Sequence, residues 1–557
     1  MIDLSTYNCL KLNDAAQPAP AYLTGPSLAA KPIAPSAEAE ILAHLRALTS
    51  WRADAASAAL GAVAALALPP LTLAPLLAVS IPGLLALIDG APNWRVALRR
   101  GLAFGVAHHL VGLYWITSAI LVEAADFWWA VPIAVPLLAS VLAMFIALSC
   151  AAARLVQPGW QRACMLAGAW VLGDIAREFV LTGFPWNPLG SAVEMPGVLG
   201  LVFMQPAAWV GVGGLTLFVL LLAATPALGR RAWVAALAAI LLWGAAGFAR
   251  LHRPVGPAPD LVAVIVQGNV PETEHRDHWQ DRAWVSRIFE RHLALTREGM
   301  RQAAGHRAMV VWPETASPYW LGEDAAARHA VADAAGTAIA TIAGTPRMDA
   351  ANKAHNSLVA VMPDASIGGV YDKFHLVPYG EYFPSYLPIR LGEQGWTPGP
   401  GLRTLHVKGL PPIGPLICYE AAFPAQVAIE SDRPAMLVNI TNDSWFGNSA
   451  GPRQHLAAAR MRAVEEGLPV VRAANTGISA VIDAHGAIVA SLGLDHTGVL
   501  VAAIPGMVAP TPESRLGLAA PSLLAILSCM IALGRKRGAV RFMDELRPKN
   551  TNSIPKS

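Results

Sequence analysis

Long runs without charged residues alternate with short charged connections over the first half of the chain. Such runs cover residues 55–88, 101–122, 127–153, 195–229, 232–249 and 516–534, and another apolar stretch extends from 163 through a short charged segment to 181. A helix needs about 20 mostly apolar residues to cross the hydrocarbon core of a bilayer. The first run is long enough for two short helices that turn at Pro69 and Pro70. A single run of this kind is also typical of a buried core helix. So many runs in one chain instead predict eight membrane spans, seven before Arg250 and one near the C-terminus.

Basic residues between the runs indicate how the spans are oriented. They occupy the connections after the second, fourth and sixth spans, whereas the connection after the third holds Glu123 and Asp126 and no base. Because cytoplasmic loops are enriched in Lys and Arg, both chain ends are predicted inside and the segment after the seventh span outside. No cleavable signal peptide is evident, so the first span is expected to act as the targeting signal. The basic residues are Arg95, Arg99, Arg100, Arg154, Arg162, Arg230, Arg231 and the tail 535–537.

The stretch from 257 to 510 has a different texture, with frequent charges between short apolar segments. Roughly 250 residues of this kind can bury a full hydrophobic core. Segments rich in β-branched residues predict strands and amphipathic segments predict helices. The predicted strands are 261–266, 309–312, 338–343, 357–362, 413–418, 436–440, 470–473 and 478–482, and the predicted helices are 279–304, 324–335 and 452–467.

Composition agrees with a chain of two unlike parts. Of the 557 residues, 54% are hydrophobic and 14% are charged, against roughly 25% charged in ordinary soluble domains. This excludes a disordered chain, a basic nucleic-acid-binding protein and a purely soluble enzyme. The predicted organisation is a polar, Ala/Pro-rich extension at 1–50, a membrane domain at 51–252, an extracytoplasmic domain at 257–510, an eighth span at 515–536 and a cytoplasmic tail at 537–557.

Cys418 is the only one of the five cysteines in the predicted outer domain. A disulfide framework or a multi-cysteine metal site within that domain is therefore excluded. A lone cysteine is either a buried small hydrophobe or a nucleophile. The residues around it favour a nucleophile, because Cys418 ends an apolar strand, Glu314 follows another and Lys373 lies in a third strand-end segment. An acid, a cation and a thiol together are suited to thiol-based acyl transfer.

Motifs around these three residues resemble the apolipoprotein N-acyltransferase family, a membrane-bound branch of the carbon–nitrogen hydrolase (nitrilase) superfamily. The resemblance covers residues 51–537, and the extension before it stays unexplained. The motifs are VQGNVP at 266–271, WPE at 312–314, KFHLVPYGE at 373–381, CYE at 418–420, NDSWFG at 442–447 and GPRQH at 451–455, with GDIARE at 173–178 and TGFPW at 182–186 in the membrane part.

The resemblance implies a catalytic set of Glu314 as general base, Lys373 as oxyanion stabiliser and Cys418 as nucleophile. It also implies supporting or substrate-binding roles for four further residues. Of these, Glu381 could instead be a loop charge and Trp279 a helix-face tryptophan. The four are Glu381, Tyr419, Glu420 and Trp279.

Six further residues have no catalytic role in this prediction. Arg177 and Glu178 are expected to pair near the outer end of the fifth span, and His455 is expected to be structural. Asn442, Asp443 and Trp445 are expected to shape the pocket.

The implied fold is an eight-span helical membrane domain with a nitrilase-like α-β-β-α sandwich. The implied partners are a phospholipid acyl donor, a diacylglyceryl-modified apolipoprotein acceptor and the bilayer of the bacterial inner membrane, with the sandwich on the periplasmic side. The chain is expected to be a monomer without nucleic acid, cofactor or metal. A membrane-anchored amidase that transfers the acyl group to water is an alternative, and a polytopic receptor or transporter with a ligand-binding outer domain is a second.

Overall fold

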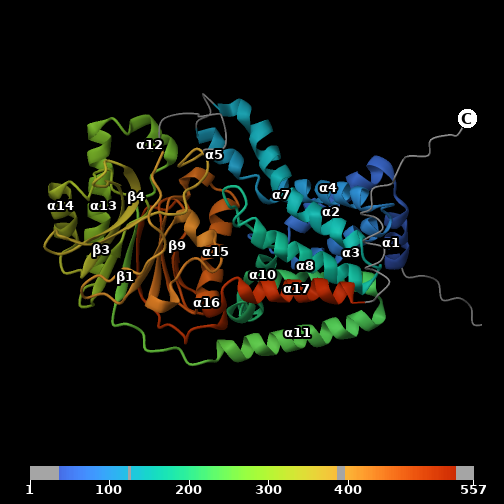
Figure 1. The fold of residues 1–557 in the computed structure, drawn as a ribbon. Coiled ribbons are helices and arrows are strands. Elements are labelled where there is room, and N and C mark those ends of the chain that lie inside the picture. Colours follow the sequence, from blue (N-terminus) through green and yellow to red (C-terminus); the bar gives the residue numbers. More distant parts are fainter. Residues whose placement is uncertain (1–36, 123–126, 385–394, 535–557) are drawn as a thin grey trace, which may run out of the picture.

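A helical half and an α/β half lie side by side in the structure (Figure 1). The computed structural model describes residues 37–122, 127–384 and 395–534. The extension before residue 37, the acidic connection at Glu123 and Asp126 and the basic tail from Arg535 therefore lie outside the described residues. The helices of the first half are α1 Ala37–Ala47, α2 Ser50–Ala65, α3 Leu77–Asp89, α4 Trp94–Gly112, α5 Ile116–Val122, α7 Val131–Arg154, α8 Trp160–Ala176, α9 Gly197–Met204, α10 Ala207–Ala223, α11 Arg230–Leu251 and α17 Ala519–Leu533.

Within the described residues, two helices are long and apolar enough by themselves to cross a membrane. One is 128–154, which joins a short 3-10 turn to α7, and the other is α11. Two further pairs qualify only together, because α4 and α5 bend by 57° and α9 and α10 by 99° at their breaks. Helices α3 and α17 are apolar but shorter. The structure thus has two to four candidate spans by length and composition, and it does not confirm the predicted eight.

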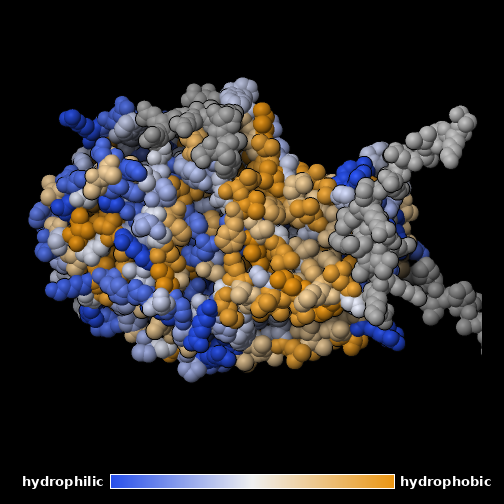
Figure 2. Space-filling view, in the orientation of Figure 1, coloured by the Kyte–Doolittle hydropathy of each residue, from blue (hydrophilic) through white to orange (hydrophobic). Residues whose placement is uncertain are grey.

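Charged side chains join several helix ends in the helical half. Asp89 at the end of α3 pairs with Arg162 of α8, and Arg46 of α1 pairs with the same carboxylate at 3.1 Å. Arg154 at the end of α7 donates to the carbonyl of Ala91 at 2.7 Å. These arginines donate hydrogen bonds to Asp89 and to loop carbonyls, and the bonds fix the positions of the helix ends. Figure 2 shows apolar residues gathered over the helical half and hydrophilic residues over the α/β half.

Two sheets pack face to face in the α/β half. One has six strands in the order β11-β1-β2-β3-β4-β5 and the other has five in the order β10-β9-β8-β7-β6. Apolar side chains from both sheets, among them Ile265, Val311, Ile417 and Val438, are fully buried between them. The strands are β1 Val262–Gln267, β2 Ala308–Val311, β3 Ala340–Met348, β4 Ala354–Val361, β5 Ile367–Asp372, β6 Ile413–Ile417, β7 Met436–Thr441, β8 Val470–Ala474, β9 Ser479–Ile482, β10 Ile488–Leu492 and β11 Gly498–Ala503.

Helices cover the outer faces of both sheets. Successive residues of a strand point to opposite faces, so Val264 and Val310 face outward while Ile265 and Val311 face the other sheet. The outward residues of the six-stranded sheet pack against α13 (Arg282–Gln302) and α14 (Ala325–Ala335). Those of the five-stranded sheet pack against α15 (Gly451–Glu466). The predicted α-β-β-α sandwich is confirmed, as are the eight predicted strands, while β5, β10 and β11 were not predicted.

Hydrogen bonds join the two halves along α15. Glu465 accepts from the backbone N–H of Val212 in α10 at 2.7 Å, and Arg250 of α11 donates to the carbonyl of Val464 at 3.0 Å. Gln205, at the bend between α9 and α10, donates to the carbonyl of His485 at 2.8 Å. These bonds are buried, so the sandwich is held against the helical half in one orientation. The predicted residue limits of the domains stay a prediction.

Candidate active site

Glu314 lies just after β2, where the chain leaves the six-stranded sheet. One carboxylate oxygen accepts from Asn356 at 2.8 Å and from Lys373 at 3.0 Å, and the other accepts from the backbone N–H of Asn442 at 2.8 Å. Only 6% of the residue is exposed. Gly344 of β3 leaves room for the backbone here, because a Cβ on it would lie 2.6 Å from the Cα of Glu314. The carboxylate is therefore held in one orientation by three donors.

Lys373 follows β5 and lies between two carboxylates. Its ammonium is 3.0 Å from Glu314 and 2.9 Å from Glu381, and it is 1% exposed. Burial by itself lowers the pKa of Lys373, but Glu314 and Glu381 raise it well above its ordinary value. The side chain is therefore a fixed cation. Asn356 of β4 donates to both acids, at 2.8 and 3.0 Å, and so holds the pair around the lysine.

Cys418 ends β6 and begins a short 3-10 turn, Cys418–Ala422. Its φ of +50° is rarely adopted by a residue with a side chain. Burial and the neighbouring Glu314 carboxylate raise the pKa of the Cys418 thiol, and Lys373 opposes them. The group therefore rests as a neutral thiol within the field of both Glu314 and Lys373. It needs a base to become a nucleophile.

The carboxylate of Glu420 accepts hydrogen bonds from neighbouring groups of the chain and does not line an open pocket. It accepts from the backbone N–H groups of Ile417 at 2.7 Å and Phe374 at 2.8 Å, and from the hydroxyl of Tyr371 at 3.1 Å. Burial raises the pKa of Glu420 to about 7 against the effect of these N–H groups. The residue links the segment after Lys373 to the start of the Cys418 turn, so it positions both.

Tyr419 faces the helical half. Its hydroxyl donates to the carbonyl of Gly183 at 2.9 Å, and its ring stacks on Trp186 with centroids 6.4 Å apart. Phe423 and Phe184 also lie against it. The nucleophile is thus followed at once by an aromatic wall shared with the helical half.

The other two predicted site residues have different surroundings. Glu381 joins the catalytic group, because it contacts Lys373 and Asn356 and accepts from the backbone N–H of Val377 at 2.7 Å. Trp279 is not brought to that group: it is 58% exposed at the end of α12 (Glu272–His278). The first turn of that helix does border the site, because Glu272 accepts from Asn442 at 2.9 Å. A lipid contact of Trp279 stays a prediction.

The predicted pair of Arg177 and Glu178 is wrong. Arg177 instead lies 3.0 Å from Asp174, one turn earlier on α8, and donates to the carbonyl of Trp186 at 2.7 Å. An i, i+3 spacing places two side chains on the same face of a helix, whereas adjacent residues diverge.

Two functional contacts were missed from the sequence. Asn356 was not singled out, although an Asn in an apolar strand is a signal for a buried polar contact. His455, expected to be structural, donates to the carbonyl of Cys418 at 2.9 Å and pairs with Asp443 at 2.8 Å. Although burial by itself raises it, Arg472 and His455 lower the pKa of Asp443 to about 2. The Asp443 carboxylate holds His455, and His455 in turn holds the backbone carbonyl of Cys418.

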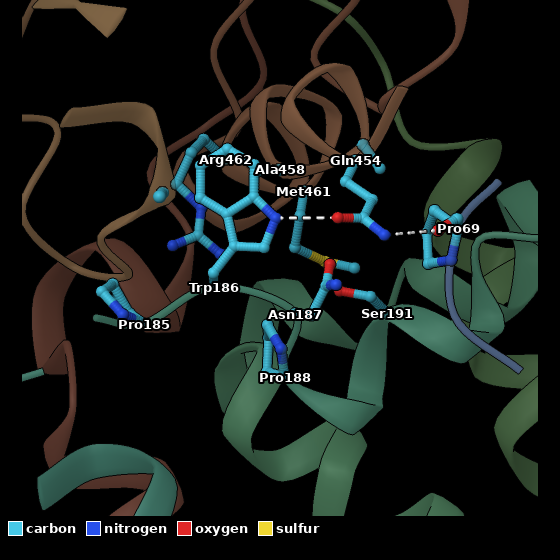
Figure 3. A pocket seen from close by; sticks show the side chains of 12 residues that line it. Pro69, Pro185, Trp186, Asn187, Pro188, Ser191, Gln454, Ala458, Met461 and Arg462 are labelled. Carbon is cyan, nitrogen blue, oxygen red and sulfur yellow. Dashed lines mark hydrogen bonds between the residues drawn. The ribbon is translucent and has the colours of Figure 1, made fainter. Parts of the chain in front are cut away.

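A small cavity of about 20 Å³ lies behind the turn, at the junction of the halves (Figure 3). Trp186, Gln454, Met461 and Arg462 are among its lining residues. Within the described residues, no group of three or more His, Cys, Asp or Glu side chains is placed to hold a metal ion. The arrangement is suited to nucleophilic catalysis by a thiol, with one acid as base and one cation at the reacting carbonyl.

Family models match both halves of the chain. Residues 60–225 match the apolipoprotein N-acyltransferase N-terminal domain and residues 265–513 match the carbon-nitrogen hydrolase family. The chain is 37% identical to an apolipoprotein N-acyltransferase of Rhodopseudomonas palustris, covering 87% of this chain and 96% of that protein. It is also 37% identical to one of Bradyrhizobium diazoefficiens, covering 87% and 95%.

Solved structures similar to this chain cover about half of it. A carbon-nitrogen hydrolase from Helicobacter pylori is 20% identical, with a TM-score of 0.34, covering 52% of this chain and 98% of that chain. An amidase from a Nesterenkonia species is 17% identical, with a TM-score of 0.31, covering 45% and 93%.

Proposed function

The chain belongs to the apolipoprotein N-acyltransferase family, and we propose that it moves a fatty acyl chain from a phospholipid to the N-terminal amine of a diacylglyceryl-cysteine lipoprotein, through a thioester on Cys418. The observation that supports this most is the buried ammonium of Lys373, held between Glu314 and Glu381 beside the thiol. A cation fixed before the reaction can stabilise an oxyanion without rearrangement.

In the first half-reaction, the sulfur of Cys418 attacks the ester carbonyl of the phospholipid while Glu314 takes the thiol proton. The tetrahedral oxyanion faces the ammonium of Lys373. When it collapses, the ester C–O bond breaks and Glu314 returns its proton to the departing lysophospholipid oxygen. An S-acyl Cys418 remains.

In the second half-reaction, the neutral α-amine of the acceptor attacks the thioester carbonyl. Glu314 takes a proton from the nitrogen, the C–S bond breaks, and that proton passes to the sulfur. The products are an amide and free Cys418. Two half-reactions through one covalent intermediate give ping-pong kinetics.

The proposed setting is the bacterial inner membrane, with eight spans, both ends in the cytoplasm, and the sandwich on the periplasmic side as a monomer. The charge-free runs and the basic connections support this setting. Both substrates are lipid-anchored, and each methylene extracted from lipid into water costs about 0.8 kcal/mol. An enzyme joined to helices at the bilayer avoids that extraction.

The amidase alternative shares the same catalytic residues but uses water as acceptor. The match of residues 60–225 to the N-terminal domain of the acyltransferase family favours transfer to an amine. A receptor or transporter would leave the buried ammonium between two acids without a purpose.

Intact-mass analysis of the purified full chain after exposure to phospholipid micelles tests the proposal. We expect one acyl adduct that hydroxylamine removes and that a synthetic diacylglyceryl-cysteine peptide discharges to an N-acyl peptide. Cys418→Ala should form none, while Cys529→Ala, a change in α17 far from the site, should form it normally. Consumption of the peptide with Cys418 unmodified would contradict the thioester, and release of free fatty acid in place of the N-acyl peptide would favour the amidase.

A further inference from the structure

Gln454 leaves the first turn of α15 and enters the helical half. Its amide oxygen accepts from the indole N–H groups of Trp115 at 2.8 Å and Trp186 at 2.9 Å. Its amide nitrogen donates to the carbonyls of Pro69 at 3.1 Å and Gly112 at 3.2 Å. Figure 3 shows the side chain between Trp186 and Pro69 at the edge of the cavity.

These four bonds use the whole hydrogen-bonding capacity of a primary amide. Gln454 is 5% exposed, so water does not replace a lost partner. A carboxylate at this position would face two carbonyl oxygens, and an apolar side chain would leave two indoles and two carbonyls unpaired. Each buried group left unpaired costs about 1–3 kcal/mol. The site therefore requires an amide and joins three separate segments of the helical half to one residue of the sandwich.

The next residue on α15 holds the nucleophile. Both ring nitrogens of His455 are engaged, by the Cys418 carbonyl at 2.9 Å and the Asp443 carboxylate at 2.8 Å, and the ring is fully buried. Trp186, held by Gln454, lies 5.4 Å from the ring of His455 and stacks on Tyr419. Gln454 thus fixes both the helix turn that holds the Cys418 carbonyl and the aromatic wall beside the nucleophile.

We propose that Gln454 is a positioning residue for acyl transfer, one that fixes the position of the helical half relative to the Cys418 turn. It acts through Trp186 and His455 and does not itself react. This inference rests on the proposed function, because the rate it controls is that of thioester formation. A misplacement of about 1 Å can slow a positioned reaction about a hundredfold, so loss of the amide should slow acylation without removing the nucleophile.

The test is single-turnover acylation of the detergent-solubilised full chain, with phosphatidylethanolamine and phosphatidylglycerol micelles as separate probes. The amplitude of adduct formation reports the fraction of folded enzyme and the rate constant reports positioning. In Gln454→Met and Gln454→Glu the unpaired groups should destabilise the junction and lower the amplitude, and in the enzyme that stays folded we expect a rate constant at least about tenfold lower with a nearly unchanged KM for the phospholipid. Trp115→Phe, which removes one donor, should have a smaller effect.

Gln302→Met is the matched control, because Gln302 is exposed on α13 and bonds only Glu298, at 2.9 Å. It should react like wild type. A wild-type rate constant in both Gln454 variants would overturn the inference, and so would a loss of amplitude with an unchanged rate constant, which shows a purely structural role. Absence of an adduct in the wild type would instead contradict the proposed function.

Discussion

Lys373 and the acid Glu381 beside it should contribute unequally to the acylation rate. Lys373→Met removes the cation that faces the developing oxyanion, and loss of one such donor typically costs about 10²–10³ in rate. Glu381→Gln leaves the ion pair between Lys373 and Glu314 intact. It replaces one oxygen of residue 381 by an amide nitrogen, which cannot accept a hydrogen bond from Lys373 or from the backbone N–H of Val377. We therefore expect a drop in the acylation rate constant of about 10²–10³ for Lys373→Met and about tenfold for Glu381→Gln, measured by adduct formation. Equal losses would show that Glu381 does more than orient the lysine.

Gly344 is a second residue whose size matters to the site. A Cβ there would lie 2.3 Å from the carbonyl oxygen of Pro313 and 2.6 Å from the Cα of Glu314. Gly344→Ala must therefore shift the backbone that holds the Glu314 base, and acylation should slow at least about tenfold. Gly369→Ala in β5 is the control, because its Cβ would lie at ordinary contact distance from the side chains of Val407, at 3.6 Å, and Leu405, at 3.8 Å. If both variants acylate at the wild-type rate, the close approach at Gly344 is unimportant.

Among the elements, strands buried on both faces were the easiest to predict. β1 and β2 are parallel neighbours covered by helices and by the second sheet, so they form continuous apolar runs. In β5, Gly368 and Gly369 interrupt such a run. β10 is apolar in sequence but lies at the edge of its sheet with Ile488 and Val489 exposed, so it lacks the burial of the central strands. β11 pairs with β1 from the other end of the domain, a long-range contact that local pattern does not express.

The number of membrane spans was harder to predict from charge-free runs. A run records composition but not the path of the helix within it. The run 195–229 bends by 99° between α9 and α10, and the run 101–122 bends by 57°. The break between α9 and α10 falls at Gln205 and Pro206, where proline cannot continue the helical hydrogen bonds and the side chain of Gln205 bonds the sandwich at His485. The apolar nature of these elements was therefore predictable and their geometry was not.

Close helix contacts in the helical half depend on small residues. A Cβ on Gly61 of α2 would lie 2.0 Å from the carbonyl oxygen of Phe104 in α4. Gly61→Ala should separate these helices, and overpacking of this kind typically destabilises by about 1–3 kcal/mol. Thermal unfolding in detergent measures the effect. Gly244→Ala in α11 meets no atom within 4 Å and should not lower the midpoint. Equal midpoints for the two variants would refute this account of the packing.

At the scale of the whole molecule, the predicted site residues came from separate motifs, and the structure brings Glu314, Lys373 and Glu381 into direct contact. Glu314 and Lys373 were predicted because they lie in strand-end segments that resemble a family pattern, and Glu381 was predicted from the resemblance alone. The bonds that connect the halves were not predicted. Gln454 and His455 lie in a motif that the sequence analysis quoted, but only the fold shows that one faces the helical half and the other the nucleophile.

Buried acids at the junction make the stability of the whole molecule depend on pH. Burial raises the pKa of Glu194 to about 8 against Arg460 and Arg462, and burial together with Glu465 raises the pKa of Glu513. A carboxyl whose folded-state pKa is raised stabilises the fold below its unfolded value, near 4.3, and loses that contribution progressively until the pH reaches the folded-state value. The thermal midpoint of the full chain should therefore fall as pH rises from about 4.3 to about 8, and this contribution should level off above that pH. A Glu194→Gln, Glu513→Gln double variant keeps both groups neutral, so its midpoint should fall less. Parallel slopes for wild type and variant between these pH values would show that other groups cause the pH dependence.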